Sequence, residues 1–282
     1  MKKKDTKKRA QKSKTARAGK KSGKRKKSNR KIALNIWAIA FFIITLIILI
    51  CIPHIKDISS SEKGDRIPTG GYAYGIDISH YQTDIVWDSL MVLTDGHDRT
   101  IRSTTAAKEI KPVSFVFIKA TEGISLKDRH FTKNWKNADE TGIRKGAYHF
   151  FRSSKDPSGQ ADNFIKTVGD ISSDDLPPVL DIETIHKGCS KEELNRRALI
   201  WLKKIEQHYG RKPIVYSPAS FINDILSEEI KENYPIWVAH YRSDRPDAEK
   251  WDLWQCTDKG IIYGIKGLTD ISVCTTDALR AL

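Results

Sequence analysis

The segment Asp181-Ile182-Glu183 places two carboxylates one residue apart at the end of the apolar run 177–180. In a β-strand, residues i and i+2 lie on the same face and are separated by about 6 to 7 Å along the chain. Two acids held this close can divide proton donation and charge stabilisation between them, because their surroundings can shift their pKa values apart. The spacing therefore predicts acid/base chemistry at the end of a strand.

The elements that would position this pair alternate between β-type and helical stretches. We expect helices over 131–141, 157–168, 190–209 with Ser190 as N-cap, and 219–231. We expect eight strands, over 72–77, 114–120, 145–151, 178–183, 213–217, 236–240, 252–256 and 268–272. The alternation predicts the α/β class, and eight is the strand count of a (β/α) barrel.

Polar side chains gather at one end of these expected strands. The acids are Asp77, Asp181, Glu183 and Asp270, and between them come Lys119, Glu122, Tyr148, His149, Tyr216, His240, Tyr241 and Gln255. A single aspartate at a strand end often caps the next turn. Several strands that deliver acids to one rim favour a site instead, because barrel enzymes build their sites at that end.

The positive charge belongs to the N-terminal tail. Residues 1–31 contain 17 of the 49 Lys and Arg residues and one acid, Asp5, whereas residues 32–282 carry a net charge of −2. The tail has almost no large apolar residues, so we expect it to be disordered. It could neutralise the phosphates of a nucleic acid, but the balanced charge of the rest disfavours a specific nucleic-acid partner.

Residues 32–52 carry no charge over 21 positions. As a helix they would span about 31 Å, close to the thickness of a bilayer core, so we expect a transmembrane helix. Arg30 and Lys31 precede it, which predicts a single-pass protein of the cytoplasmic membrane with its N-terminus inside and its later residues outside. The basic tail would then contact anionic lipids. The run exceeds a signal-peptide core and no small-residue cleavage site follows, so we expect no cleavage.

Residues 53–70 contain Ser59-Ser60-Ser61, Gly64 and Pro68 and read as a linker. We expect the folded domain to occupy 71–282.

Seven motifs in this domain together resemble glycoside hydrolase family 25, the lysozymes or muramidases that cut peptidoglycan. They are GIDISHYQ at 75–82, FVFIKATEG at 115–123, GAYHF at 146–150, LDIE at 180–183, IWVAHY at 236–241, WQ at 254–255 and TDIS at 269–272. Each motif alone is a weak pattern, but seven in order make a specific signal.

The resemblance implies a modified barrel with about five β/α units followed by three strands. It implies that Glu183 is the general acid and that Asp77, Asp181 and Asp270 are the other site carboxylates. It also implies a retaining, substrate-assisted route, in which the acetamido group of the muramic sugar attacks the anomeric carbon and an aspartate orients that amide. We assign this role to Asp181, with Asp270 as second choice; direct attack by a carboxylate stays open.

For a sugar substrate, aromatic planes suit the apolar faces of the rings. Tyr148, Tyr216, Tyr241 and Trp254 are therefore expected to bind substrate together with Gln255 and Lys119, whereas Phe150 and Trp237 are expected in the core. Lys119 is expected to pair with a carboxylate of the rim, and Glu122 to fix the turn after its strand.

Two stretches depart from the family pattern. Residues 91–111 add turn-forming sequence that predicts an inserted hairpin or lid. Ser272 stands where the family usually has a residue such as Asn, so we expect the chemistry to persist with a changed substrate register.

Neither a metal nor another cofactor is predicted, because His149 and His240 lie on distant strands without further ligands in a metal-site spacing. Cys256 and Cys274 could form a disulfide across neighbouring strands, and free thiols are the other possibility. The sequence carries no signal for the oligomeric state.

Two functional hypotheses follow. The leading one is a membrane-anchored muramidase that acts on peptidoglycan, cleaving between N-acetylmuramic acid and N-acetylglucosamine. The alternative is a catalytically silent, membrane-anchored scaffold that binds the cell wall. The four carboxylates favour the enzyme.

Overall fold

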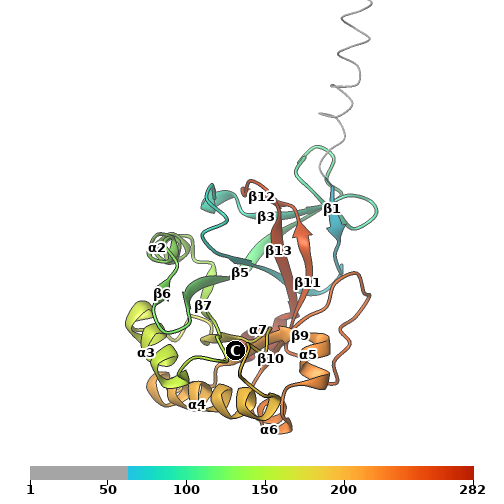
Figure 1. The fold of residues 1–282 in the computed structure, drawn as a ribbon. Helices are drawn as coiled ribbons and strands as arrows, with labels where there is room; N and C mark the ends of the chain where they lie inside the picture. The colour runs from blue at the N-terminus through green and yellow to red at the C-terminus, as the bar shows by residue number, and fades with distance from the viewer. Residues whose placement is uncertain (1–62) are drawn as a thin grey trace, which may run out of the picture. The chain divides into compact units, whose positions relative to one another are not determined.

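The expected strands close into one barrel in the computed structural model, which describes residues 63–282 (Figure 1). Its eight strands are β2 (Tyr72–Ile78), β5 (Glu109–Glu122), β7 (Arg144–Phe150), β8 (Val179–Asp181), β9 (Ile214–Pro218), β10 (Ile236–Ala239), β11 (Leu253–Gly260) and β13 (Thr269–Thr275). The pairing runs β5-β2-β13-β11-β10-β9-β8-β7, and β7 pairs with β5 to complete the ring. The predicted barrel is confirmed as a closed, mixed α/β barrel.

Strand β13 gives the barrel its mixed character. It runs antiparallel to both of its neighbours, β2 and β11, whereas the other neighbouring pairs in the ring are parallel. The reversed direction brings the start of β13 to the end of β2, so Asp270 pairs with Asp77. Two acids that are 193 positions apart in the sequence thereby become direct cross-strand neighbours.

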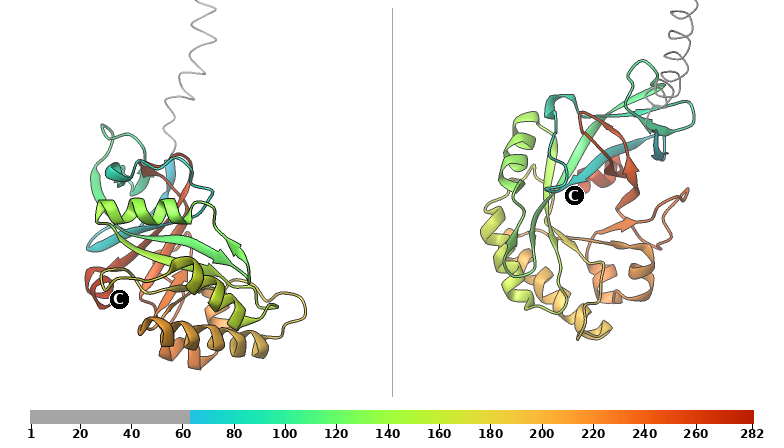
Figure 2. Two further views of the ribbon diagram at one scale, coloured as in Figure 1. Left: turned by 90° about the vertical axis from the view of Figure 1, so that its left-hand side faces the viewer. Right: turned by 45° about the horizontal axis from the view of Figure 1, so that its top comes forward.

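Helices connect the parallel strands from β5 to β10 and lie on the outside of the ring (Figure 2). They are α2 (Phe131–Thr141), α3 (Pro157–Val168), α4 (Lys191–Tyr209) and the pair α5 (Ala219–Asp224) and α6 (Glu228–Asn233). The expected single helix over 219–231 is wrong, because the first helix ends at Asp224 and the chain starts a second helix after Ser227. A last helix, α7 (Thr276–Ala281), follows β13.

Local signals set the ends of the longest helix, α4. The Ser190 hydroxyl accepts a hydrogen bond from the Glu193 amide at 3.2 Å, as expected of an N-cap, and Gly210 ends the helix with φ of 67°. Trp201, Leu202 and Ile205 bury the inner face of α4 against the barrel. The connection after β2 differs from the others, since it holds only the 3-10 turn η1 (Trp87–Ser89) and a hairpin.

The barrel interior is filled by the side chains of alternate residues along the strands. Phe115 and Phe117 of β5 pack with Val179, Ile214, Trp237 and Leu253 from four other strands. The Phe117 and Trp237 rings lie 4.5 Å apart. Gly75 makes room for this packing, because a Cβ there would lie 2.1 Å from the Phe115 ring. These side chains form one packed cluster inside the barrel.

The insertion over 91–111 forms the predicted hairpin. Strand β3 (Met91–Thr94) pairs antiparallel with three partners, which are β4 (Arg99–Ile101), the first residues of β5, and β12 (Ile262–Tyr263). A short strand β6 (Leu126–Lys127) folds back on the end of β5.

The folded part begins before the predicted boundary at Gly71. Strand β1 (Lys63–Arg66) lies inside the expected linker and pairs with β4, and Ile67 is 4% exposed. A Cβ on Gly64 would lie 2.1 Å from the Thr100 hydroxyl, so β1 fits closely against the hairpin. The interpretation of residues 63–70 as a linker is corrected by this pairing.

Several predictions lie outside the described residues: the basic tail over 1–31, the transmembrane helix over 32–52 and the first part of the linker. Within residues 63–282, no helix is both long enough and apolar enough to cross a membrane. Cys189, Cys256 and Cys274 are free thiols, and the Cys256 thiol donates to the Ile271 carbonyl.

Candidate active site

A pocket of about 180 Å³ opens at the carboxyl ends of the parallel barrel strands. Four acids line it, Asp77, Asp181, Glu183 and Asp270. We call it the carboxylate pocket. The rest of its wall comes from Lys119, Tyr148, Phe150, Tyr216 and Trp237. The structure thus brings together all four acids that the sequence singled out, and no residue of the 91–111 hairpin lines the pocket.

The backbone after β8 explains how Asp181 and Glu183 reach the same pocket. Strand β8 ends at Asp181, but the Ile182 amide still donates to the Tyr216 carbonyl of β9 at 2.9 Å. The Ser217 hydroxyl donates to the Ile182 carbonyl. The chain therefore stays extended for one more step, with Ile182 fully buried on the far side and both acids on the near side.

The two acids differ in their access to solvent. Asp181 is 6% exposed, and its Oδ1 atom has no hydrogen-bond partner among the residues that the structure describes. Glu183 lines the same pocket but is an exposed residue. Asp181 thus offers a free hydrogen-bond acceptor inside the pocket, and Glu183 is accessible to a ligand that enters from solvent.

Gln255 connects three of the other wall strands. Its Oε1 accepts hydrogen bonds from the hydroxyls of Tyr216, at 2.7 Å, and of Tyr241. Its Nε2 donates to Asp77 at 2.8 Å and to Asp270 at 3.4 Å. Gln255 was predicted to bind substrate; the structure places it 1% exposed, with its side chain holding Asp77 and Asp270 in position.

Burial raises the pKa values of all four acids, and repulsion by nearby acids adds to the rise at Asp77, Asp181 and Asp270. Burial is the main cause for Asp77, followed by the charge of Asp270, and burial raises the pKa of Asp270 to about 6. Burial and the negative charge of Glu183 raise the pKa of Asp181. Burial also raises the pKa of Glu183, although a hydrogen bond with Asp181 and the Lys119 charge offset part of it. Protons are therefore retained in this pocket to higher pH than on free carboxyls.

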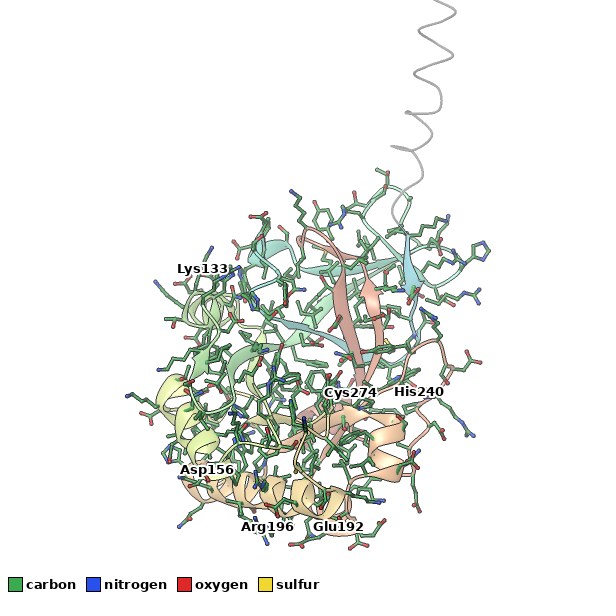
Figure 3. The ribbon with its side chains drawn as sticks, viewed as in Figure 1. Lys133, Asp156, Glu192, Arg196, His240 and Cys274 are labelled. Atoms are coloured by element: carbon green, nitrogen blue, oxygen red, sulfur yellow. The ribbon has the colours of Figure 1, made fainter. Side chains whose placement is uncertain are left out.

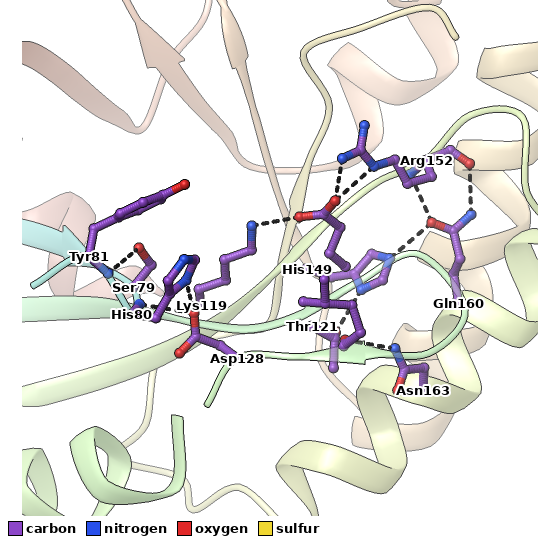
Figure 4. Close-up of polar contacts among 12 residues, drawn as sticks. Ser79, His80, Tyr81, Lys119, Thr121, Asp128, His149, Arg152, Gln160 and Asn163 are labelled. Atoms are coloured by element: carbon purple, nitrogen blue, oxygen red, sulfur yellow. Dashed lines mark hydrogen bonds and ion pairs between the residues drawn. The ribbon is translucent and has the colours of Figure 1, made fainter. Parts of the chain in front are cut away.

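A fifth acid, Glu122, has cations beside it and is the unlabelled side chain bonded to Lys119 and Arg152 in Figure 4. Glu122, the last residue of β5, accepts from Lys119 Nζ at 2.8 Å and from Arg152 Nε at 2.9 Å. We call these three residues the Glu122 cluster. Burial alone would raise the pKa of Glu122, but the two cations together hold it below its usual value. Lys119 does pair with a rim carboxylate as predicted, and its partner is Glu122.

Whether a predicted aromatic residue reaches the pocket depends on which face of its strand it occupies. Tyr148 and Tyr216 line the carboxylate pocket, and so do Phe150 and Trp237, which were expected in the core. Trp254 was predicted to bind substrate, but it is 1% exposed and its indole N–H donates to the His240 carbonyl at 2.7 Å. On β11 the inward side chains are Leu253 and Gln255, so Trp254 points outward into the core between barrel and helices.

Two polar residues that the sequence singled out, Ser272 and His149, are buried and bond to neighbouring side chains. Ser272, the departure from the family pattern, accepts a hydrogen bond from the Trp237 indole N–H at 3.0 Å. His149 is fully buried between Thr121 and Gln160, and burial lowers its pKa to about 4, so it stays neutral (Figure 4). Among residues 63–282, no three His, Cys, Asp or Glu side chains form a group that could hold a metal ion.

Comparison with known proteins places this geometry in one family. The sequence model of the family described as "Glycosyl hydrolases family 25" matches residues 76–265. The chain is 41% identical over 220 residues to the uncharacterized protein YegX of Escherichia coli strain K12, covering 77% of this chain and 75% of YegX. It is 32% identical over 222 residues to lysozyme M1 of Streptomyces globisporus, covering 74% of this chain and 69% of that lysozyme.

Solved structures agree with this match. The crystal structure of a bacterial lysozyme from Streptomyces coelicolor aligns with a TM-score of 0.63 at 30% identity, over 76% of this chain and 98% of the lysozyme. A family 25 glycosyl hydrolase from Bacillus anthracis aligns with a TM-score of 0.60 at 28% identity, over 74% and 92% of the two chains.

Proposed function

The chain belongs to glycosyl hydrolase family 25, and we propose that it is a muramidase that hydrolyses the β-1,4 bond between N-acetylmuramic acid and N-acetylglucosamine in peptidoglycan. One observation carries the proposal for this chain. Four carboxylates meet in a single pocket at the carboxyl ends of the barrel strands, and their pKa values are raised.

Glu183 acts as the general acid. It protonates the departing O4 of N-acetylglucosamine as the bond to C1 of the muramic sugar breaks. Two properties suit it to this role: its pKa is raised, so the proton is retained, and its carboxyl is accessible at the pocket mouth. In the second half of the reaction the Glu183 carboxylate accepts a proton from the water that adds to C1, which restores the starting state.

Asp181 orients the nucleophile, which belongs to the substrate. The acetamido oxygen of the muramic sugar attacks C1 and forms a cyclic oxazolinium ion, and Asp181 accepts a hydrogen bond from the acetamido N–H. The unpartnered Oδ1 of Asp181 supports this role, because a buried acceptor without a partner is costly unless the substrate supplies a donor. Asp77 and Asp270, held by Gln255, face the developing positive charge.

The identity of the new reducing end tests the proposal. Full-length protein is incubated with purified peptidoglycan, the products are reduced with borohydride, and the reduced sugars are identified by mass spectrometry. We expect reduced muramic acid from the wild-type protein and none from Glu183→Gln. Reduced glucosamine would assign the other glycosidic bond, and wall binding without release of any product would favour the scaffold.

We further propose that residues 32–52 anchor the enzyme in the cytoplasmic membrane, with the barrel outside and the basic tail against anionic lipids. The uncharged run of 21 residues and the preceding Arg30 and Lys31 support this topology. Sedimentation with membranes, resistance to alkaline extraction and digestion of the barrel by protease added to spheroplasts are the expected results. A barrel protected from external protease would contradict the orientation.

A further inference from the structure

A second pocket adjoins the carboxylate pocket on the side of β9 and β10. It has a volume of about 520 Å³, larger than the carboxylate pocket, and the two pockets share Glu183 and Tyr216 in their walls. Pro218, Ala219 and Ala239 form part of its surface, and His240, Tyr241 and Asp247 supply polar groups. Glu183, the acid that protonates the bridging oxygen, therefore lies between the two pockets.

The position of Glu183 assigns an occupant to each compartment. The sugar that acquires positive charge must lie among the acids, which places the muramic sugar in the carboxylate pocket. The oxygen that Glu183 protonates bridges this sugar and the leaving sugar, so the leaving sugar lies on the other side of Glu183. Only the carboxylate pocket contains Asp77, Asp181 and Asp270, and the second pocket contains none of them.

The hydrogen bonding of His240 fixes what it can offer to a ligand. His240 follows the last residue of β10 (Figure 3), and its Nδ1 accepts a hydrogen bond from the Asp247 amide at 2.9 Å. A backbone amide can only donate, so Nδ1 is the acceptor and the neutral ring carries its proton on Nε2. The ring thus offers an N–H donor as its second polar group in the wall of the pocket.

The surrounding backbone holds His240 in a fixed position. Its amide donates to the Gln255 carbonyl at 3.1 Å, and its carbonyl accepts from the Trp254 indole N–H. The neighbouring Tyr241 hydroxyl donates to Gln255 Oε1, the same side chain that holds Asp77 and Asp270. The wall of the second pocket and the acids of the first are therefore anchored to one residue.

We propose that the pocket lined by His240, Tyr241 and Asp247 binds the leaving N-acetylglucosamine, and that His240 Nε2–H donates a hydrogen bond to an acceptor oxygen of that sugar. This inference rests on the muramidase function proposed above. His240 acts as a specificity residue for the leaving group, without a part in proton transfer at the reacting atoms.

Two substitutions separate the ligand role of His240 from a structural role. In His240→Gln, the amide nitrogen takes the place of Nε2 and retains a donor toward the pocket. In His240→Asn, the amide oxygen takes the place of Nδ1 and retains the acceptor for the Asp247 amide, while the donor is lost. Each full-length variant is assayed on soluble, uncrosslinked glycan strands and on an aryl β-glycoside of the N-acetylglucosaminyl-N-acetylmuramic acid disaccharide, whose leaving group is not a sugar.

We expect His240→Asn to lower kcat/KM on the glycan about tenfold, mainly through KM, and to change the aryl glycoside rate less than twofold. His240→Gln is expected to stay close to the wild type on both substrates. His97→Asn, an exposed position on the inserted hairpin, serves as the matched control and is expected to change neither rate.

Three results would overturn the assignment: wild-type activity of His240→Asn on the glycan, an equal loss on both substrates, or a larger loss for Gln than for Asn. The last would show that only the bond to the Asp247 amide matters. Failure of the proposed muramidase function can be told apart from failure of the His240 assignment, because the wild-type protein itself would then release no product from the glycan. That result would also overturn the assignment of the second pocket.

Discussion

Glu122 and Glu183 lie at the same end of one barrel and have opposite surroundings. Glu122 ends β5 between Lys119 and Arg152, whereas Glu183 follows β8 and shares its pocket with three other acids. The pKa of Glu122 is lowered and that of Glu183 is raised. The difference shows that the charged groups beside a glutamate, and not its residue type or its position at a strand end, decide whether it keeps a proton.

The comparison predicts its largest effect for the exchange of each glutamate for glutamine. Glu183→Gln should lower kcat on peptidoglycan by about 10³-fold, because the amide cannot donate a proton to the leaving oxygen. Glu122→Gln should lower kcat less than about tenfold, since it removes only a neighbour of Lys119. Steady-state rates give the ratio, with thermal unfolding as the check on folding. Equal losses of kcat in the two variants would contradict the distinction between the Glu122 cluster and the carboxylate pocket.

The second prediction concerns the partner of Glu183. Asp181→Asn should lower kcat by about 10²-fold, because an amide in place of the carboxylate stabilises the positive oxazolinium ion less well. The same variant should bind peptidoglycan as tightly as the wild type, which sedimentation with insoluble wall measures. A loss of binding with unchanged kcat would show that Asp181 only positions the ground state.

The third prediction concerns stability at the pocket. The folded pKa of Asp270 is raised to about 6, so its contribution to stability is fully present below the unfolded value near 4 and is lost as pH rises through about 6. Asp270→Asn should therefore raise the free energy of unfolding by on the order of 2 kcal/mol at pH 7.5 and leave it unchanged at pH 4. Urea denaturation at both pH values measures this. Destabilisation at pH 7.5 would contradict the account.

The fourth and smallest effect has the opposite sign. The pKa of Glu122 is lowered on folding, so its contribution is present above the unfolded value near 4.3 and is lost as pH falls. Glu122→Gln should lower the free energy of unfolding by at most about 1 kcal/mol at pH 7, and the difference should vanish near pH 3. A cost that persists at pH 3 would mean that packing, not charge, is responsible.

Much of this arrangement could be predicted from the sequence because local patterns report it directly. The eight strands and the N-cap at Ser190 follow from periodicity and capping chemistry. The acids at the strand ends could be placed on one rim because strands of a barrel share an end. Asp181 and Glu183 share a pocket because the chain stays extended through Ile182.

Other features depend on pairing partners that local sequence does not name. Trp237 and Trp254 lie in similar apolar runs, but one faces the pocket and the other the outer core, since register decides the face. Strand β1 has the sequence Lys-Gly-Asp-Arg, without apolar alternation, and it forms because the inserted hairpin offers β4 as an edge. One cation beside Glu122, Lys119, lies three residues earlier on the same strand, but the other, Arg152, follows β7, and only the fold brings it to Glu122.

Site-resolved titration of Glu122 and Glu183 measures directly whether their surroundings shift the two pKa values in opposite directions. Carbon-13 chemical shifts of the side-chain carboxyls are followed against pH in glutamate-labelled protein, with Glu183→Gln and Glu122→Gln used to assign the two signals. We expect the pKa of Glu183 to lie above that of a free glutamate carboxyl and the pKa of Glu122 to lie below it. A Glu183 pKa equal to or lower than that of Glu122 would contradict this expectation.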